Sequence, residues 1–120
     1  MTTEPHRPDP PPDVCLLLRA NAEARWLSNE LVPVVRQLEQ NPRTGTALTY
    51  LEVLRLDARR HAAETDAARL ALDALEPNGD AAMYSNARRY HAAVRRLRSR
   101  VERRVTLALA SAAQPDARIA

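Results

Sequence analysis

Two short clusters of turn-forming residues divide the chain into three long segments, and apolar residues recur every three or four positions within each segment. The clusters lie at residues 41–45 and 77–80 and contain Pro, Asn and Gly, residues that turns favour. An apolar spacing of three and four places the apolar side chains on one face of an α-helix, whereas a strand requires strict alternation. The pattern therefore predicts three long helices and no strand.

The three expected helices cover residues 14–40, 46–76 and 81–113. Asp13 and Asp80 precede the first and third helices, where an aspartate caps a helix by accepting hydrogen bonds from its first free N–H groups. Pro33 falls inside the apolar stripe of the first helix, where it lacks a donor and crowds the preceding turn. We therefore expect the first helix to kink near Asn29 rather than to run straight.

The turns between the helices are short, which forces neighbouring helices to run antiparallel. The expected fold class is therefore all-α: an elongated, antiparallel three-helix bundle (up-down-up), kinked at Pro33 and completed by dimerisation. Residues 14–113 form this single bundle domain. Residues 1–13 contain five prolines and are expected to be disordered, and residues 114–120 are expected to form a flexible tail.

Composition argues against several classes of protein. Cys15 is the only cysteine, so an internal disulfide is impossible and nothing indicates an oxidising compartment. No stretch approaches the roughly 18 uninterrupted apolar residues of a membrane span, and residues 1–13 lack the pattern of a signal peptide. The expected location is the cytoplasm, with no membrane partner.

The beginning of the second helix carries more large apolar side chains than one buried stripe needs. Residues 48–56 include six of them: Leu48, Tyr50, Leu51, Val53, Leu54 and Leu56. A surplus of this kind indicates an interface, either with a second copy of the chain as a homodimer or with another protein. The candidate interface residues are Tyr50, Val53 and Leu56, with the single tryptophan, Trp26, as an anchor of the type enriched at interfaces.

The third helix is strongly basic, because residues 81–113 contain eight arginines and one acid, Glu102. The candidates for binding an anion are Arg88, Arg89, Arg95, Arg96, Arg100 and Arg103. A nucleic-acid or other polyanion-binding module is therefore the first alternative function. The arginines come without a helix-turn-helix pattern, and the complete absence of lysine indicates that codon bias contributes to their number.

One set of ionisable residues has the spacing of a ligand site. Asp57, His61 and Glu64 share one face of the second helix, and the following turn brings His91 to within about one helical turn of His61. The second alternative is therefore a metal-dependent bundle protein or enzyme. Carboxylate-bridged metal sites in bundles draw acids from several helices, however, and the third helix has no acid near His91.

The chain has no Ser-His-Asp order, phosphate loop or paired cysteines, so we expect no catalytic residue, cofactor or resident metal. The function that the sequence favours is a non-enzymatic helical-bundle interaction protein. Such a protein would be small and regulatory, or an adaptor, and would act through protein–protein contacts.

Overall fold

The computed structural model describes residues 10–42, 45–75 and 81–113, with only the backbone described at 81–83. Within these ranges the chain is all-α and has no strand. The elements are α1 (Pro12–Trp26), the π-helical turn η1 (Leu27–Leu31), α2 (Val32–Gln40), α3 (Gly45–Ala74) and α4 (Ala81–Ala113). Because α1, η1 and α2 follow one another without a break, they form one rod. The predicted all-α fold of three long helices is thus confirmed.

The first helix begins at Pro12, two residues before the expected boundary. A proline in the first turn sacrifices no hydrogen bond, because the N–H groups there have no partner within the helix. Asp13, the expected cap, lies inside this turn and is buried, and no side chain caps the helix. Its carboxylate is still favourably placed near the positive end of the helix dipole. The expected disorder of residues 1–9 and the expected tail at 114–120 lie outside the described residues.

A π-helical turn, η1, lies at the place where the sequence predicts a kink, near Asn29. Pro33 follows it in the first turn of α2, so the residue without an N–H lies where the rod returns from π-helical to α-helical bonding. A π turn widens the helix locally and is one of the few places where a helix bends. The chain therefore passes the proline without ending the rod.

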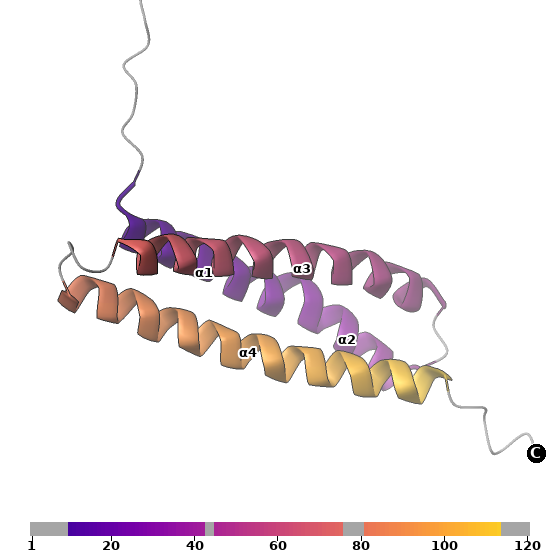
Figure 1. Cartoon of the computed structure of the whole chain (residues 1–120). Coiled ribbons are helices and arrows are strands. Elements are labelled where there is room, and N and C mark those ends of the chain that lie inside the picture. The colour runs from indigo at the N-terminus through magenta and orange to yellow at the C-terminus, as the bar shows by residue number, and fades with distance from the viewer. Residues whose placement is uncertain (1–9, 43–44, 76–80, 114–120) are drawn as a thin grey trace, which may run out of the picture.

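The rod of α1, η1 and α2 occupies the centre of the molecule. In Figure 1, α3 runs back beside this rod and α4 runs forward again. Both α3 and α4 pack more extensively on α1 than on each other. The first rod therefore meets the inner faces of both other helices, and it can join them through its own side chains.

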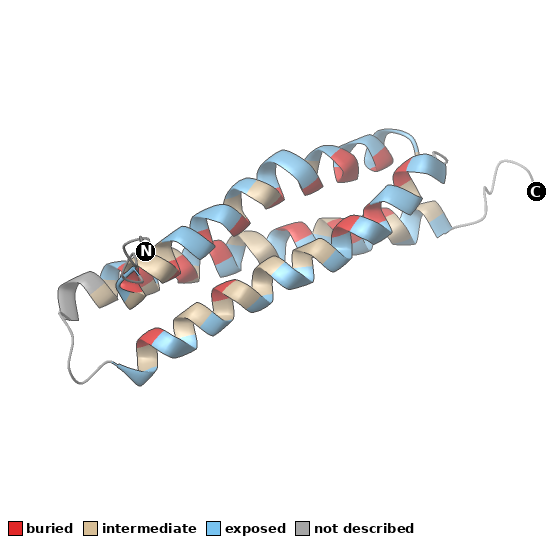
Figure 2. Cartoon of the chain, turned by 90° about the horizontal axis from the view of Figure 1, so that it is seen from above, coloured by how far each residue is buried: buried red, intermediate tan, exposed pale blue. Residues whose placement is uncertain are grey.

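The buried apolar residues form two clusters. The larger cluster gathers side chains from η1, α2, the first half of α3 and the second half of α4. The smaller one is built on Leu16, Leu72 and Ala87. Figure 2 shows the buried positions on the helix faces that look toward one another and the exposed positions outside. Along the helices, buried polar residues lie between the two clusters: Glu23, Thr65 and His91.

Candidate functional site

Four ionisable side chains from three helices meet between the two apolar clusters. Arg98 of α4 donates from Nε and Nη2 to the two carboxylate oxygens of Glu23 on α1, at 2.6 and 2.9 Å. The same guanidinium donates from Nη1 and Nη2 to Asp66 of α3, at 3.1 and 3.2 Å. His91 Nε2 lies 3.0 Å from Asp66 Oδ1. We call Glu23, Asp66, His91 and Arg98 the polar cluster; through Arg98 it joins all three helices.

The environment of the polar cluster keeps its charges in place. Glu23 is 1% exposed, so its ionised carboxylate depends on the guanidinium beside it. The hydrogen bond with Glu23 raises the pKa of Arg98. Burial alone would raise the pKa of Asp66, but hydrogen bonds from Arg98 and His91 outweigh it and lower that pKa below its ordinary value. Asp66 is therefore held as a carboxylate, the state that suits a structural ion pair.

The structure does not bring the four metal-ligand candidates together. Each of them has a different neighbour: His61 lies beside Trp26 with 5.0 Å between ring centroids, Glu64 pairs with Arg19, Asp57 pairs with Arg60, and His91 pairs with Asp66. Across the described ranges, no group of three or more His, Cys, Asp or Glu side chains is placed to hold a metal ion. The hypothesis of a shared His61 and His91 site therefore has no geometric support.

The outward face of α3 carries a second stripe, which consists of apolar and small residues apart from one arginine, Arg60. Eight exposed positions follow alternating steps of four and three: Thr49, Val53, Leu56, Arg60, Ala63, Ala67, Leu70 and Ala74. We call this set the outer α3 stripe. Its two leucines are among the most exposed large apolar residues, Leu56 at 64% and Leu70 at 69%. This spacing, sustained over the helix, is typical of a helix that pairs with another helix.

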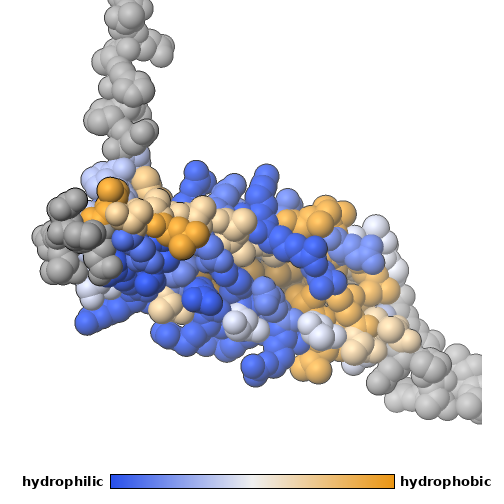
Figure 3. Space-filling model, in the orientation of Figure 1, coloured by the Kyte–Doolittle hydropathy of each residue, from blue (hydrophilic) through white to orange (hydrophobic). Residues whose placement is uncertain are grey.

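The predicted interface residues divide between this surface and the interior. Val53 and Leu56 belong to the outer α3 stripe, and Tyr50 borders it with a half-exposed side chain. Trp26 is half-buried against His61, so most of its indole already packs within the bundle. Figure 3 shows apolar surface along α3 and at the end of the molecule where α3 begins and α4 ends, with polar surface between. The outer α3 stripe is therefore the more accessible part of the predicted interface.

The arginines of α4 fall into two groups. Three face neighbouring helices and pair with carboxylates there: Arg88 with Asp73, Arg98 with Glu23 and Asp66, and Arg104 with Glu39. The others are exposed and make no ion pair with any described residue: Arg89, Arg95, Arg96, Arg100 and Arg103. Arg88, one of the predicted anion ligands, is thus already engaged by an acid.

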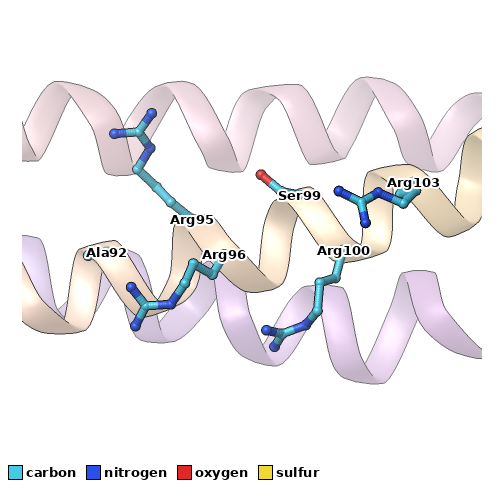
Figure 4. A pocket seen from close by; sticks show the side chains of 6 residues that line it. All are labelled: Ala92, Arg95, Arg96, Ser99, Arg100 and Arg103. Carbon is cyan, nitrogen blue, oxygen red and sulfur yellow. The ribbon is translucent and has the colours of Figure 1, made fainter.

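Four of these exposed arginines surround a shallow hollow of about 490 Å³ on the outer face of α4, which Ala92 and Ser99 also line. Figure 4 shows Arg95 reaching to one side of α4, Arg96 and Arg100 reaching to the other, and Arg103 lying along the helix toward Ser99. Ala92 lies at one end of this set and Ser99 near its middle. We call this feature the α4 arginine groove. It brings together four of the six predicted anion ligands.

Sequence reasoning missed Glu23 and Asp66 as partners of Arg98. A local signal existed for Glu23, because it falls among the apolar positions of the first helix, between Ala20 and Leu27. An acid on a buried stripe requires a basic partner. The choice of Arg98 from eight arginines in the third helix had no such signal, since Glu23 and Arg98 are 75 positions apart.

The fold and these surfaces define a small helical bundle with one internal polar cluster and two distinctive outer faces. No known family model, curated protein or solved structure matches the chain. None of the helices, over the residues described, is long and apolar enough to cross a membrane. The outer faces of α3 and α4 are therefore the features of the molecule that bear on its function.

Proposed function

We propose that the protein is a non-enzymatic interaction protein, an up-down-up bundle that pairs with a second copy of itself through the outer α3 stripe. In this role it serves as a regulatory or adaptor protein. The observation that carries the proposal is the exposed stripe itself, which repeats at the spacing of paired helices and lies opposite the buried residues of α3 such as Leu51 and Leu72.

The energetics of the outer α3 stripe favour its burial. Leu56, Leu70 and Val53 are each more than half exposed. Burying the exposed part of each would gain a corresponding share of the roughly 1.5–3 kcal/mol that full burial of such a side chain supplies, before the entropic cost of association. Ala63 and Ala67 separate the large residues and would let a second helix backbone approach closely. The stripe therefore combines apolar anchors with the small residues that close helix packing requires.

The order of large and small residues in the stripe favours a second copy in antiparallel orientation. In a two-fold pair, each residue contacts a partner residue and the reverse contact is equivalent. An antiparallel register centred between residues 60 and 63 sets Leu56 against Ala67 of the second copy and Val53 against Leu70. Large residues then fit beside small ones at the centre, whereas a parallel pair would place Leu56 against Leu56 and Ala63 against Ala63.

The ionisable residues support a binding role rather than catalysis. The buried acid Glu23 and its partner Arg98 hold helices together, and His61 packs against Trp26. General acid–base catalysis needs a group aimed at a pocket that excludes water. Two hollows on α4 are instead surface features, one lined mainly by arginines and the other by a mixture of apolar and charged residues.

Sedimentation equilibrium over a concentration series tests the proposal. The chain has a mass of 13.4 kDa, and we expect a species of twice that mass which L56E/L70E converts to monomer, because two charges then face the interface. The matched control, L18E/L107E, places the same charges on exposed leucines of α1 and α4 and should leave the dimer intact. A wild-type monomer at every concentration, or equal loss of the dimer in both variants, would contradict the proposal.

A further inference from the structure

We propose that the α4 arginine groove binds the phosphate backbone of a duplex nucleic acid without reading its sequence. The groove is strongly basic. Arg95, Arg96, Arg100 and Arg103 line one hollow, and no acid lines it with them. Four cations gathered without a counter-charge repel one another, so this face gains most from a ligand that brings several negative charges.

The rest of the surface shows that this clustering is specific to one face of α4. Glu102, the only acid of residues 81–113, lines a different hollow together with Arg55 and Arg59. The inward arginines of α4, such as Arg98 and Arg104, are neutralised by acids on other helices. The four groove arginines therefore differ from Arg98 and Arg104, because no acid of the described residues pairs with them.

The geometry of the groove suits a repeating anion. Arg96 and Arg100 are one helical turn apart, or about 6 Å, and Arg95 and Arg103 span about 12 Å along the same axis. Guanidinium groups therefore reach to both sides of α4 along this length (Figure 4). A guanidinium binds phosphate through two parallel hydrogen bonds, and the Ser99 hydroxyl adds a donor among the arginines.

The residues that line the groove favour a duplex over other polyanions. No aromatic side chain lines the groove, so it offers no platform on which unpaired bases could stack, as single-strand binding surfaces do. Its only apolar lining residue is Ala92, which provides no large side chain for insertion into a membrane. Contacts limited to phosphates fix position on a duplex but carry no sequence information.

Fluorescence anisotropy with a short labelled DNA duplex tests the proposal over a series of roughly 50 to 200 mM salt. Four phosphate contacts predict a slope of log affinity against log salt of about −3 to −4. R96Q/R100Q should make that slope shallower by about 2 and weaken binding equally for two duplexes of unrelated sequence. The control R25Q/R36Q removes the same charge from exposed positions of α1 and α2 and should leave the slope unchanged.

Three results would overturn the proposal. The first is no duplex binding at the lowest salt. The second is an equal change of slope in R96Q/R100Q and R25Q/R36Q, which would show attraction by net charge alone. The third is binding of polyglutamate or of vesicles rich in anionic lipid more tightly than duplex DNA, with the same dependence on Arg96 and Arg100, which would assign the groove to an acidic polypeptide or a membrane surface. Circular dichroism of each variant confirms that the fold is retained.

Discussion

Glu23 and Arg98 illustrate how one buried pair fixes the arrangement of a small bundle. Either residue alone in an apolar interior would destabilise the fold, because an ionised side chain loses its hydration there. Together they satisfy one another through two hydrogen bonds, and Arg98 adds Asp66 from the third helix. These contacts require Glu23, Asp66 and Arg98 to lie at one level of the three helices, so we expect the polar cluster to specify alignment more than it adds stability.

Removing one member of this pair should be more damaging than removing both. E23A leaves the Arg98 guanidinium without its closest partner, and we expect it to lower the free energy of unfolding by about 3–5 kcal/mol. E23L/R98L replaces both charges by apolar groups. Its free energy of unfolding should lie within about 1 kcal/mol of the wild-type value or exceed it. Urea unfolding followed by circular dichroism measures both variants. A double variant as unstable as E23A would show that the pair itself supplies net stability.

Asp66 gives the bundle a defined response to acid. Its pKa in the folded state lies below the ordinary value, so the unfolded chain binds more protons as the pH falls through about 4. The stabilisation from Asp66 is therefore complete above that pH and is lost progressively below it. Thermal unfolding between about pH 6 and pH 2.5 should show this loss, and D66N should flatten the curve. An unchanged pH profile in D66N would assign the acid response to other carboxylates such as Glu39 and Asp73, whose pKa values are also lowered.

At the scale of an element, the first rod shows how a helix accommodates an internal proline. Pro33 would interrupt a regular helix, but η1 ends just before it and α2 begins with it in the first turn. The apolar positions on either side, Leu27 and Leu31 in η1 and Leu38 in α2, all remain buried. The π turn thus preserves one continuous buried face across the irregularity.

Replacing Pro33 should consequently change the free energy of unfolding very little. An interior proline in a regular helix is destabilising by about 3 kcal/mol, but at the start of α2 the missing donor is already tolerated. We expect P33A to change the free energy of unfolding by less than about 1 kcal/mol, as measured by urea titration. V35P, at the fourth residue of α2 and at a fully buried position, serves as the contrast and should unfold the rod. A gain near 3 kcal/mol in P33A would mean that the proline strains the native rod.

The elements were predictable from the sequence because their signals are local. The apolar period of three and four, with Pro, Asn and Gly between the segments, located the helices to within a few residues. The π turn was foreseeable only as an irregularity, since Pro33 indicates where a helix is disturbed and not how it adjusts. The polar cluster and the division of the α4 arginines were not predictable, because each depends on which residues of distant segments meet. Arg88 and Arg95 are each the first residue of an Arg-Arg pair, and only the packing of α3 gives Arg88 an acid.

At the scale of the whole molecule, the three helices leave two chemically different surfaces exposed to solvent. The outer α3 stripe is mostly apolar or small, with Arg60 near its middle, and faces away from the buried residues of α3. The α4 arginine groove is basic and faces away from the buried residues of α4. Because the faces lie on different helices, a dimer formed through α3 would leave the groove of each copy accessible. We therefore expect the proposed self-association and the proposed anion binding to be independent, so a variant that abolishes one should preserve the other.

Disulfide trapping tests the central claim, antiparallel pairing through α3, most directly. In a background that carries C15S, chains with L56C and chains with A67C are mixed and oxidised, since the predicted register brings these two positions of different copies together. We predict a covalent dimer in the mixture and little in either chain alone. Efficient dimer formation by L56C alone, as a parallel pair would give, or no covalent dimer in the mixture, would contradict the account.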